Sequence, residues 1–303
     1  MTVQRRHSPW PSPLAKPITR PYIVANIASA SQEINKHSLL VEGNGKCYNV
    51  MTSVGMQRLI VLFTNFGDHG PYLGQMEAVL YRCAPEQRVI NLLADAPAHD
   101  IRAAAYLLAA YAVEFPPESV FLAVVDPSVG GPRRPLVIKA SGRWYVGPDN
   151  GLFEIIVRRA KVPADCWEIT WVPERLSPSF HGRDLFGPIA ARIASGESVA
   201  ENHDFKPCAV DNGFRDWPDD LAEIIYIDHF GNAITGLRAQ TLPDDAEIAL
   251  YGRLVPRAKT FSSVSPGEMF CYENSNGLLE IAINMGRAAN QQGIELGGKV
   301  SVS

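Results

Sequence analysis

Residues 119–134, SVFLAVVDPSVGGPRR, decide the fold of this chain. The apolar run at 120–125 is typical of a strand that is buried on both faces. It ends at Asp126-Pro127, and a loop of small residues then leads to Arg133 and Arg134. Ligands of open α/β sheets bind beyond the carboxyl ends of the strands, so Asp126 and Arg133 can point into one such crevice. The spacing alone also allows an ordinary turn with a local ion pair.

Strands and helices alternate on both sides of this stretch. Strands are predicted at 57–63, 88–93 and 166–172, with a hairpin at 136–140 and 144–146. Helices are predicted at 72–84, 101–115 and 185–194, and a further helix follows the loop 147–151 and ends at about residue 160. Asp100 is the predicted N-cap of the helix at 101–115. This alternation predicts an α/β domain with a mostly parallel sheet and helices on both of its faces.

The pattern changes near residue 198. Residues 198–218 contain Gly, Pro and charges and are predicted to be a linker between an α/β domain at 56–197 and a smaller domain at 219–303. Short strands separated by turn residues predict an all-β, barrel-like C-terminal domain; they lie at 223–227, 233–237, 248–251, 269–272, 278–283 and 299–302. Residues 1–21 are punctuated by proline and basic residues, and the apolar residues of 23–54 follow no firm period. Residues 1–55 are therefore predicted to be a mobile N-terminal extension.

Composition narrows the class of protein. With 303 residues, 46% apolar and 20% charged, the chain can bury full cores in one or two domains. A net charge of −4 gives no basic surface for nucleic acid or for an acidic membrane. The five cysteines are odd in number and form no CxxC, which argues against a disulfide framework or a zinc site. No apolar run reaches the ~20 residues of a membrane span, and no secretory signal is recognised, so we expect a cytoplasmic protein.

Several polar loops follow predicted strand ends. His181 lies between an aromatic residue and a glycine, and the sequence alone leaves open whether it is catalytic. His69 and His99 are expected to be surface or capping groups, and Asp184 is expected to be an N-cap. The motifs GxxxxGK[ST], GxGxxG, GxSxG and HExxH are absent, and no close His/Asp pair has convincing ligand spacing. These residues predict no cofactor and no metal site, and the sequence alone does not exclude a metal.

Six motifs occur in one order: FTNFGDHGPYLGQM, VVDPSVGGPRR, GPDNGL, SFHGRD, IDHFGN and ENSNGLLEIAINMG. From residue 57 to the C-terminus, the chain resembles the S-adenosylmethionine hydrolases, or SAM hydroxide adenosyltransferases, which are relatives of the fluorinases and chlorinases. The resemblance implies an α/β domain followed by a β domain, and a homotrimer whose substrate lies between the domains of adjacent subunits. It also implies cleavage of S-adenosylmethionine by water into adenosine and L-methionine, with no cofactor.

The resemblance assigns the Asp–Arg–His set of the hydrolytic branch to Asp126, Arg133 and His181. These residue types suit the reaction. The C5′ carbon beside a sulfonium is already electrophilic, and a neutral thioether leaves without protonation, so the enzyme needs only an aligned and partly deprotonated water. Asp126 can accept from that water, Arg133 can stabilise hydroxide character, and His181 can position or relay a proton. The sequence does not decide which of the three is the base.

The same resemblance assigns the substrate contacts. Asn65 would hold the ribose diol, where the family usually has Asp, so weaker ribose binding is predicted. Further positions are Tyr72 near the methionine end, Asp228 at its ammonium group, Ser275 and Asn276 at its carboxylate, and Phe230, Asn232 and Met285 at adenine. The chain also departs from the family at DPSVGG, where DPGVGT is usual, and at Gly236, where Asn often follows the threonine.

Three other functions can be compared with hydrolysis. A halide-dependent adenosyl transferase of the same fold would favour a dry pocket of neutral donors, which the Asp–Arg–His set does not provide. A non-catalytic protein that binds S-adenosylmethionine or adenosine would leave the substrate intact. A purely structural protein would leave many polar strand-end loops without a role.

Overall fold

A computed structural model describes residues 39–43, 46–50, 58–210 and 213–303. The chain divides into two compact units, residues 1–55 and 56–303. In the first unit, β1 (Leu39–Gly43) and β2 (Lys46–Val50) form an antiparallel hairpin. The sequence pattern of this segment did not predict these strands. The mobility predicted for the rest of residues 1–55 concerns positions outside the described residues.

The second unit begins with a seven-stranded sheet. Its strands are β3 (Ile60–Thr64), β4 (Val89–Leu93), β5 (Val120–Val124), β6 (Pro135–Ala140), β7 (Arg143–Pro148), β8 (Asp165–Ile169) and β9 (Phe205–Pro207). They lie in the order β4-β3-β5-β7-β6-β8-β9. β4, β3, β5 and β7 are parallel, and β8 shares their direction because β7, β6 and β8 pair in antiparallel succession. The predicted mostly parallel sheet is confirmed.

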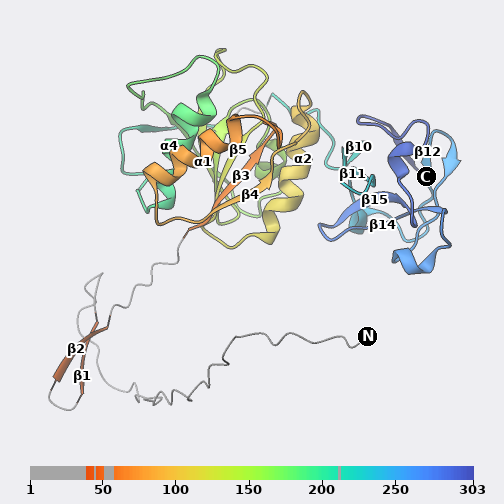
Figure 1. The fold of residues 1–303 in the computed structure, drawn as a ribbon, viewed down its shortest axis with the longest axis horizontal. Helices are drawn as coiled ribbons and strands as arrows, with labels where there is room; N and C mark the ends of the chain where they lie inside the picture. The colour runs from red at the N-terminus through yellow and green to blue at the C-terminus, as the bar shows by residue number, and fades with distance from the viewer. Residues whose placement is uncertain (1–38, 44–45, 51–57, 211–212) are drawn as a thin grey trace, which may run out of the picture. The chain divides into compact units, whose positions relative to one another are not determined.

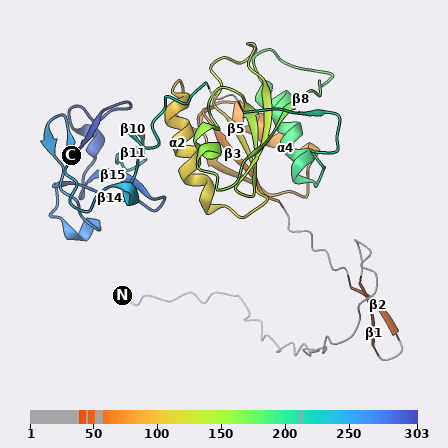
Figure 2. The same ribbon diagram turned by 180° about the vertical axis from the view of Figure 1, so that it is seen from behind.

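Helices cover both faces of this sheet (Figures 1 and 2). They are α1 (Tyr72–Cys83), α2 (Ile101–Tyr111), α3 (Glu154–Arg158) and α4 (Gly187–Ala194). α1 and α4 pack on one face, whereas α2 and α3 pack on the other. The Asp100 carboxylate accepts from the Ala103 N–H at 2.9 Å, which confirms its prediction as the N-cap of α2.

β5 lies inside the sheet and is fully buried. Phe121 and Ala123 face the core under α2, while Val120, Leu122 and Val124 face the core under α1 and α4. Burial of each large apolar side chain contributes about 1.5–3 kcal/mol. A strand covered on both faces therefore needs the continuous apolar run that opens residues 119–134.

The C-terminal part is an antiparallel all-β domain. Its strands are β10 (Leu221–Ile227), β11 (Ala233–Arg238), β12 (Ile248–Leu250), β13 (Arg253–Leu254), β14 (Met269–Glu273), β15 (Leu278–Ile283) and β16 (Val300–Val302). They form a sheet β10-β11-β15-β14 and a sheet β13-β12-β16. Single bridges between Glu223 and Lys299 and between Arg257 and Cys271 join the two sheets at both edges. This closure around one apolar core agrees with the predicted barrel-like domain.

Polar contacts connect α2 and the loop after β4 with β10. Arg102 donates to both oxygens of Glu223, at 2.9 and 2.8 Å. The Tyr226 hydroxyl donates to Asp95, with distances of 3.0 and 2.9 Å to the two carboxylate oxygens. Glu223 is buried and also binds Lys299, so this carboxylate is fully paired.

The structure differs from the sequence predictions in several places. The segment predicted as the linker 198–218 contains β9, which pairs with β8 because Phe205 packs into the core. The helix predicted to end at residue 115 ends at Tyr111, and a 3₁₀ turn follows. The predicted domain boundaries stay a prediction.

The fold also brings Cys166 and Cys208, which are distant in sequence, into contact. Their sulfurs lie 3.0 Å apart, and both are free thiols. Burial and the neighbouring Cys208 raise the pKa of the Cys166 thiol. Among the described residues, no helix is long and apolar enough to cross a bilayer.

Candidate functional site

The sheet has a topological switch point at β3. The chain leaves β3 to form β4 on one side, and later returns to form β5 on the other side of β3. Asn65 directly follows β3, and Asp126 follows β5 after one residue. The carboxyl ends of strands at such a point form the usual ligand crevice of an open α/β sheet. Both predicted residues therefore lie at the edge of the sheet where a ligand is expected.

Asp126 and Arg133 form a buried ion pair. Arg133 donates from Nε and Nη2 to Asp126 Oδ2, at 2.9 and 2.5 Å. The side chains of Asp126 and Arg133 are only 3% and 8% exposed. Asp126 Oδ1 accepts a longer bond of 3.2 Å from the Ser128 hydroxyl. The predicted pair is thus formed, and one carboxylate oxygen is largely left for another donor.

Glycine allows the connecting loop to turn. Gly130 has a φ of +81°, and a Cβ there would lie 2.7 Å from the Pro178 carbonyl oxygen. A side chain would therefore push the 126–133 loop away from the segment that leads to His181. Glycine at this position allows the two loops to meet.

His181 completes the cluster. Its Nδ1 lies 2.9 Å from Arg133 Nη2. Because a guanidinium can only donate, Nδ1 is the acceptor, and the neutral imidazole carries its proton on Nε2. The Arg133 guanidinium also lies 5.8 Å from the centre of the Phe186 ring. Arg133 is therefore the central member of the cluster, with the aspartate and the histidine bound to the same Nη2.

A π-helical turn, η2 (Gly182–Phe186), follows His181, and such turns are frequent at functional sites. Within it Arg183 forms a two-pronged ion pair with Asp184, at 2.6 and 2.9 Å. Asp184 Oδ2 also accepts from the Ser177 N–H at 2.8 Å. Its prediction as an N-cap is wrong, because the carboxylate reaches back to the preceding loop instead of capping the turn. This pairing fixes the backbone that carries His181.

The surroundings of His181 lower the pKa of its imidazole. Burial disfavours the charged form, and the adjacent Arg133 repels it, while Asp126 and Asp184 partly oppose these effects. The neutral form is also the one that accepts from Arg133. The geometry and the direction of the pKa shift therefore agree.

We expect His181 to titrate below the ordinary imidazole value of 6.5. Between the lowered pKa of the folded state and 6.5, the unfolded chain binds a proton that the folded chain does not. The stability from this group is therefore complete above pH 6.5 and is lost as the pH falls through the folded pKa. NMR titration of the ring C–H signals, assigned with His181→Gln, measures this directly. A midpoint at or above 6.5 would contradict it.

Aromatic side chains form a wall beside the cluster. Phe180 contacts both Phe66 and Tyr72 edge-on, each with a centroid distance of 5.5 Å. A Cβ on Gly182 would come within 3.2 Å of the Phe66 ring, so glycine allows this approach. The wall joins the loop after β3 to the His181 segment. Sequence reasoning assigned Tyr72 but missed Phe66 and Phe180, although both lie inside the quoted motifs.

Asn65 is half-buried on the same sheet edge, and its Nδ2 donates to the Ala98 carbonyl at 2.9 Å. This bond orients the amide and leaves Oδ1 free to accept. An aspartate could not make the same bond. The local structure therefore suits the asparagine by which this chain departs from the family pattern.

The turn between β10 and β11 contains the next predicted group. Asp228 Oδ1 accepts from the Asn232 N–H at 2.8 Å, and Oδ2 accepts from its side-chain amide at 3.2 Å. Phe230 at the turn is 70% exposed. Arg287 donates to the His229 carbonyl at 2.8 Å, which connects this turn with the segment of Met285, 87% exposed. Asp228, Phe230, Asn232 and Met285 thus lie at one end of the sheet.

Ser275 and Asn276 lie at the other end. They form the turn before β15, whereas Met285 follows β15, and β11 pairs along it from Ile281 to Leu278. The six residues of β15, at about 3.3 Å each, separate these ends by roughly 20 Å. Among residues 58–210 and 213–303, no hydrogen bond or ring contact joins the substrate residues of the β domain to the Asp126 cluster.

The sequence did not reveal the network that holds the Ser275 turn. Asn274 Oδ1 accepts from the N–H groups of Asn276 and Leu278, both at 3.0 Å. Its Nδ2 donates to Glu280 at 3.0 Å, and the other oxygen of this buried carboxylate accepts from Tyr272 at 2.5 Å. Asn274 and Glu280 are therefore candidate positioning residues.

The strand packing also explains why position 236 is a glycine in this chain. A Cβ there would lie 2.6 Å from the Leu221 side chain and 2.8 Å from its carbonyl oxygen, across the β10–β11 pair. In this packing no side chain fits. Asparagine, which the family often has here, is therefore excluded by close strand contact.

Two family models match the chain. The SAM hydroxide adenosyltransferase N-terminal domain matches residues 60–203, and its C-terminal domain matches residues 222–301. The (R)-S-adenosyl-L-methionine hydrolase of Thermus thermophilus is 37% identical over 260 residues, covering 79% of this chain and 97% of the relative. The hydrolase of the same name from Salinispora arenicola is 34% identical over 255 residues, covering 79% and 95%.

Solved structures agree with this assignment. A conserved protein from Thermotoga maritima matches with a TM-score of 0.70 and 27% identity, over 80% of this chain and 99% of that one. A conserved protein from Thermus thermophilus matches with a TM-score of 0.65 and 34% identity, over 81% and 100%. Fold, motif order and both family domains lead to one conclusion: the chain belongs to the SAM hydroxide adenosyltransferase family.

Proposed function

We propose that this protein hydrolyses S-adenosyl-L-methionine to adenosine and L-methionine. The oxygen of a water attacks C5′, the C5′–S bond breaks, and its electron pair remains on sulfur as the neutral thioether. One proton leaves the water. The observation that carries the proposal is the buried Asp126–Arg133–His181 cluster at the switch point of the sheet.

The geometry suggests a distinct role for each member. Asp126 accepts from the attacking water, because its Oδ1 holds only the long bond from Ser128. Arg133 fixes Asp126 Oδ2 and stabilises developing hydroxide character. His181 presents Nε2–H as a donor, since its Nδ1 is occupied by Arg133. Asp126 is therefore the proposed proton acceptor, a choice that the sequence left open.

The orientation of the attacking water is proposed to contribute most of the rate enhancement. The sulfonium leaves without an acid, so the site needs neither a metal nor a cofactor for the reaction. Holding water in line with the C5′–S bond replaces a bimolecular encounter, and such orientation contributes several kcal/mol, up to about 7–11 in favourable cases.

The separation within the β domain supports an extended bound substrate. Phe230, Asn232 and Met285 would hold adenine at one end, and Ser275 and Asn276 would hold the methionine carboxylate at the other. We also propose that Asn65 holds the ribose diol and that Tyr72 lies near the methionine end. The ammonium and carboxylate groups of methionine share one carbon, so Asp228, roughly 20 Å from Ser275, does not fit the ammonium role expected from the resemblance. Asp228 is instead proposed to position Asn232. The relatives' names specify the (R) form of the substrate, and we propose the same preference here.

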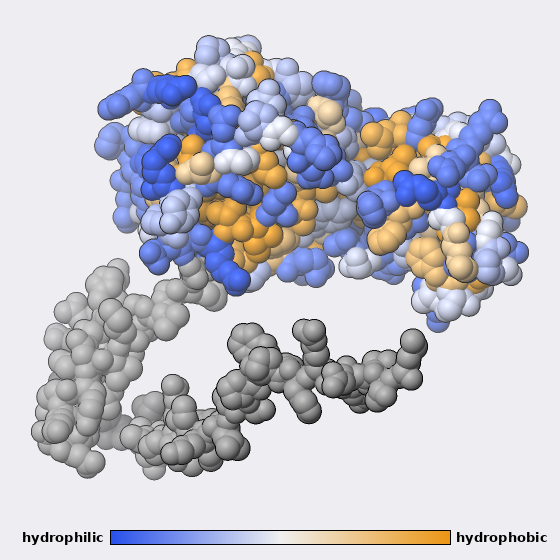
Figure 3. Space-filling view, in the orientation of Figure 1, coloured by the Kyte–Doolittle hydropathy of each residue, from blue (hydrophilic) through white to orange (hydrophobic). Residues whose placement is uncertain are grey.

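Assembly into a homotrimer would complete this site. Tyr72, Phe230 and Met285 are 51%, 70% and 87% exposed, although their proposed roles require contact with substrate. Apolar patches are open to solvent on both the α/β part and the β part (Figure 3). Such patches mark interfaces or ligand grooves. A trimer in light scattering supports this assembly, whereas a monomer in the presence of substrate contradicts it. We further propose a cytoplasmic location.

Asn65→Asp should lower the KM for S-adenosylmethionine by roughly three- to tenfold, because a charge-assisted bond to the ribose is about twice as strong as a neutral one. The same change should reduce the free energy of unfolding by up to about 1 kcal/mol, because the bond to Ala98 is lost. Steady-state kinetics and urea unfolding measure the two effects separately. An unchanged or raised KM would count against the ribose role.

Asn274→Ala should raise KM by roughly tenfold and change kcat little, because the turn carrying Ser275 and Asn276 loses two hydrogen bonds. Asn202→Ala is a matched control, since Asn202 Oδ1 holds the Asp204 N–H in the α/β part at 2.8 Å. Equal KM values for the two variants would remove Asn274 from the set of positioning residues.

Chromatography of protein incubated with S-adenosylmethionine tests the function. Adenosine and methionine should form in equal amounts in halide-free buffer, at a rate that added chloride or fluoride does not change. Halide-dependent turnover would indicate the transferase. Intact substrate after long incubation would indicate a binding protein.

A further inference from the structure

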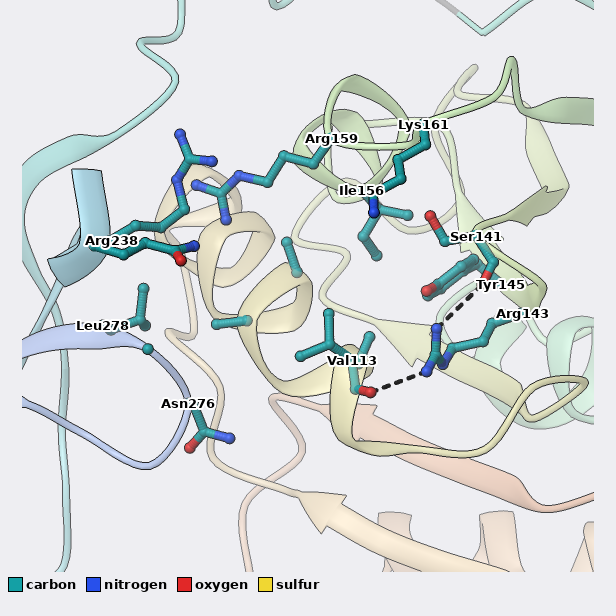
Figure 4. A pocket seen from close by; sticks show the side chains of 15 residues that line it. Val113, Ser141, Arg143, Tyr145, Ile156, Arg159, Lys161, Arg238, Asn276 and Leu278 are labelled. Carbon is teal, nitrogen blue, oxygen red and sulfur yellow. Dashed lines mark hydrogen bonds between the residues drawn. The ribbon is translucent and has the colours of Figure 1, made fainter.

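A second cavity, of about 380 Å³, lies apart from the Asp126 cluster. Its walls include Val113 beyond α2 and Ser141 and Arg143 at the β6–β7 turn (Figure 4). This turn is at the amino end of β7, which is parallel to β5, whereas Asp126 follows the carboxyl end of β5. The two sites therefore lie at opposite edges of the sheet.

The cavity is strongly cationic. Arg143, Arg159, Lys161 and Arg238 line it, and no carboxylate does so among the described residues. Two of the four already have partners. Arg238 pairs with both oxygens of Asp220, each at 2.7 Å, and Arg143 donates to main-chain carbonyls, including that of Val113 at 2.9 Å.

The other two cations have unused donors. Arg159 Nε is shielded from solvent and has no hydrogen-bond partner. Its Nη2 donates to the Asp219 carbonyl at 2.8 Å, and its nearest carboxylate, 3.7 Å away, belongs to the Asp220 that Arg238 already holds. Lys161 forms no ion pair with a described residue. Buried donors normally have partners, so the unpaired Nε indicates a missing acceptor.

The electrostatic surroundings of Arg159 also indicate that an anionic acceptor is missing. Burial and the neighbouring Arg238 lower the pKa of the Arg159 guanidinium. Figure 4 shows the guanidinium groups of Arg159 and Arg238 close to each other at one end of the cavity. Two adjacent cations with one carboxylate between them leave a positive charge that an anion would neutralise.

We propose that this cavity binds a small organic phosphate. A guanidinium fork and a lysine ammonium are the usual partners of phosphate oxygens. Apolar walls from Ala109, Ile156 and Leu278 would contact an uncharged part of the same molecule. The volume falls within the range of about 300–1,000 Å³ that is typical of small-molecule sites.

The site does not depend on the proposed hydrolysis, although it shares Asn276 with the turn proposed to hold the substrate carboxylate. Binding of phosphate compounds can be measured without substrate, so failure of this proposal and failure of the hydrolase proposal are distinguishable.

Isothermal titration calorimetry of the full chain at fixed ionic strength tests the proposal. The probes are inorganic phosphate, phenyl phosphate and, as an uncharged control, benzyl alcohol. Phenyl phosphate should bind with one site per chain and more tightly than inorganic phosphate, and benzyl alcohol should not bind. Lys161→Met and Arg159→Met should each weaken binding roughly tenfold. Lys206→Met removes an exposed cation elsewhere and should have no effect.

Saturating adenosine and L-methionine should leave phenyl phosphate binding unchanged. Displacement by either compound would overturn the proposal, because the cavity would then belong to the substrate site. Absence of saturable binding, or an equal effect of Lys161→Met and Lys206→Met, would also overturn it. Lys161 is exposed, so its variant keeps the test valid even if Arg159→Met fails to fold.

Discussion

Asp126→Asn should lower kcat by roughly 10²–10⁴-fold while KM changes little. The amide keeps the size of the carboxylate, but it cannot take up the proton of the attacking water, and proton acceptors of this kind contribute about that factor. The other members of the cluster cannot replace this acceptor, because Arg133 can only donate and His181 presents Nε2–H as a donor. Single-turnover measurements with S-adenosylmethionine separate the chemical step from product release.

A matched control is Asp204→Asn, which also removes a carboxylate paired with an arginine, Arg192, at 2.6 Å. It should lose stability without a comparable loss of kcat. If Asp126→Asn retained more than a tenth of the wild-type kcat, Asp126 would not be the proton acceptor, and His181 would become the first alternative.

Arg133→Met should lower the free energy of unfolding by about 3–5 kcal/mol, because it leaves the buried Asp126 carboxylate without its partner. It should also lower kcat by roughly 10²–10³-fold, as expected when one preorganised donor to developing negative charge is removed. The pKa of His181 should rise, since the guanidinium that repels its proton is gone. Urea unfolding, kinetics and NMR titration measure these three effects.

The adjacent arginine provides the control. Arg134 pairs with Asp149 and is 34% exposed, so Arg134→Met should be clearly less destabilising and should not shift His181. In the double variant Asp126→Asn/Arg133→Met, part of the lost stability should return, because no unpaired charge remains buried. Additive losses in the double variant would contradict the coupling between the two residues.

The central part of the fold follows from the sequence because its signals are local. The apolar run at 120–125 is a strand with both faces buried, and Asp100 caps the helix that it precedes. The seven-residue spacing of Asp126 and Arg133 also predicts their contact, since a glycine turn joins them. Such features depend on neighbouring residues alone.

Other features depend on contacts between distant residues. β9 has only three residues and includes a proline, and it forms a strand because β8 offers an open edge. Asp184 resembles an N-cap, but Arg183 and the Ser177 N–H bind it more effectively. The Arg133–His181 contact spans 48 residues, and only the fold brings these residues together.

The positions of the substrate residues in the β domain also depend on contacts between distant residues. Their motifs can be read from the sequence, but their placement at opposite ends of β15 follows from strand pairing. The cationic cavity likewise combines residues from α2, the β6–β7 turn and β11, and none of these segments forms a motif by itself.

The most direct test of the central claim is hydrolysis in labelled water. Wild-type protein and Asp126→Asn are incubated with S-adenosylmethionine in halide-free buffer, and the adenosine is analysed by mass spectrometry. We predict that adenosine gains one labelled oxygen at C5′, that an equal amount of methionine carries none, and that the variant is nearly inactive. Unlabelled adenosine, or a fully active variant, would contradict attack of water at C5′ assisted by Asp126.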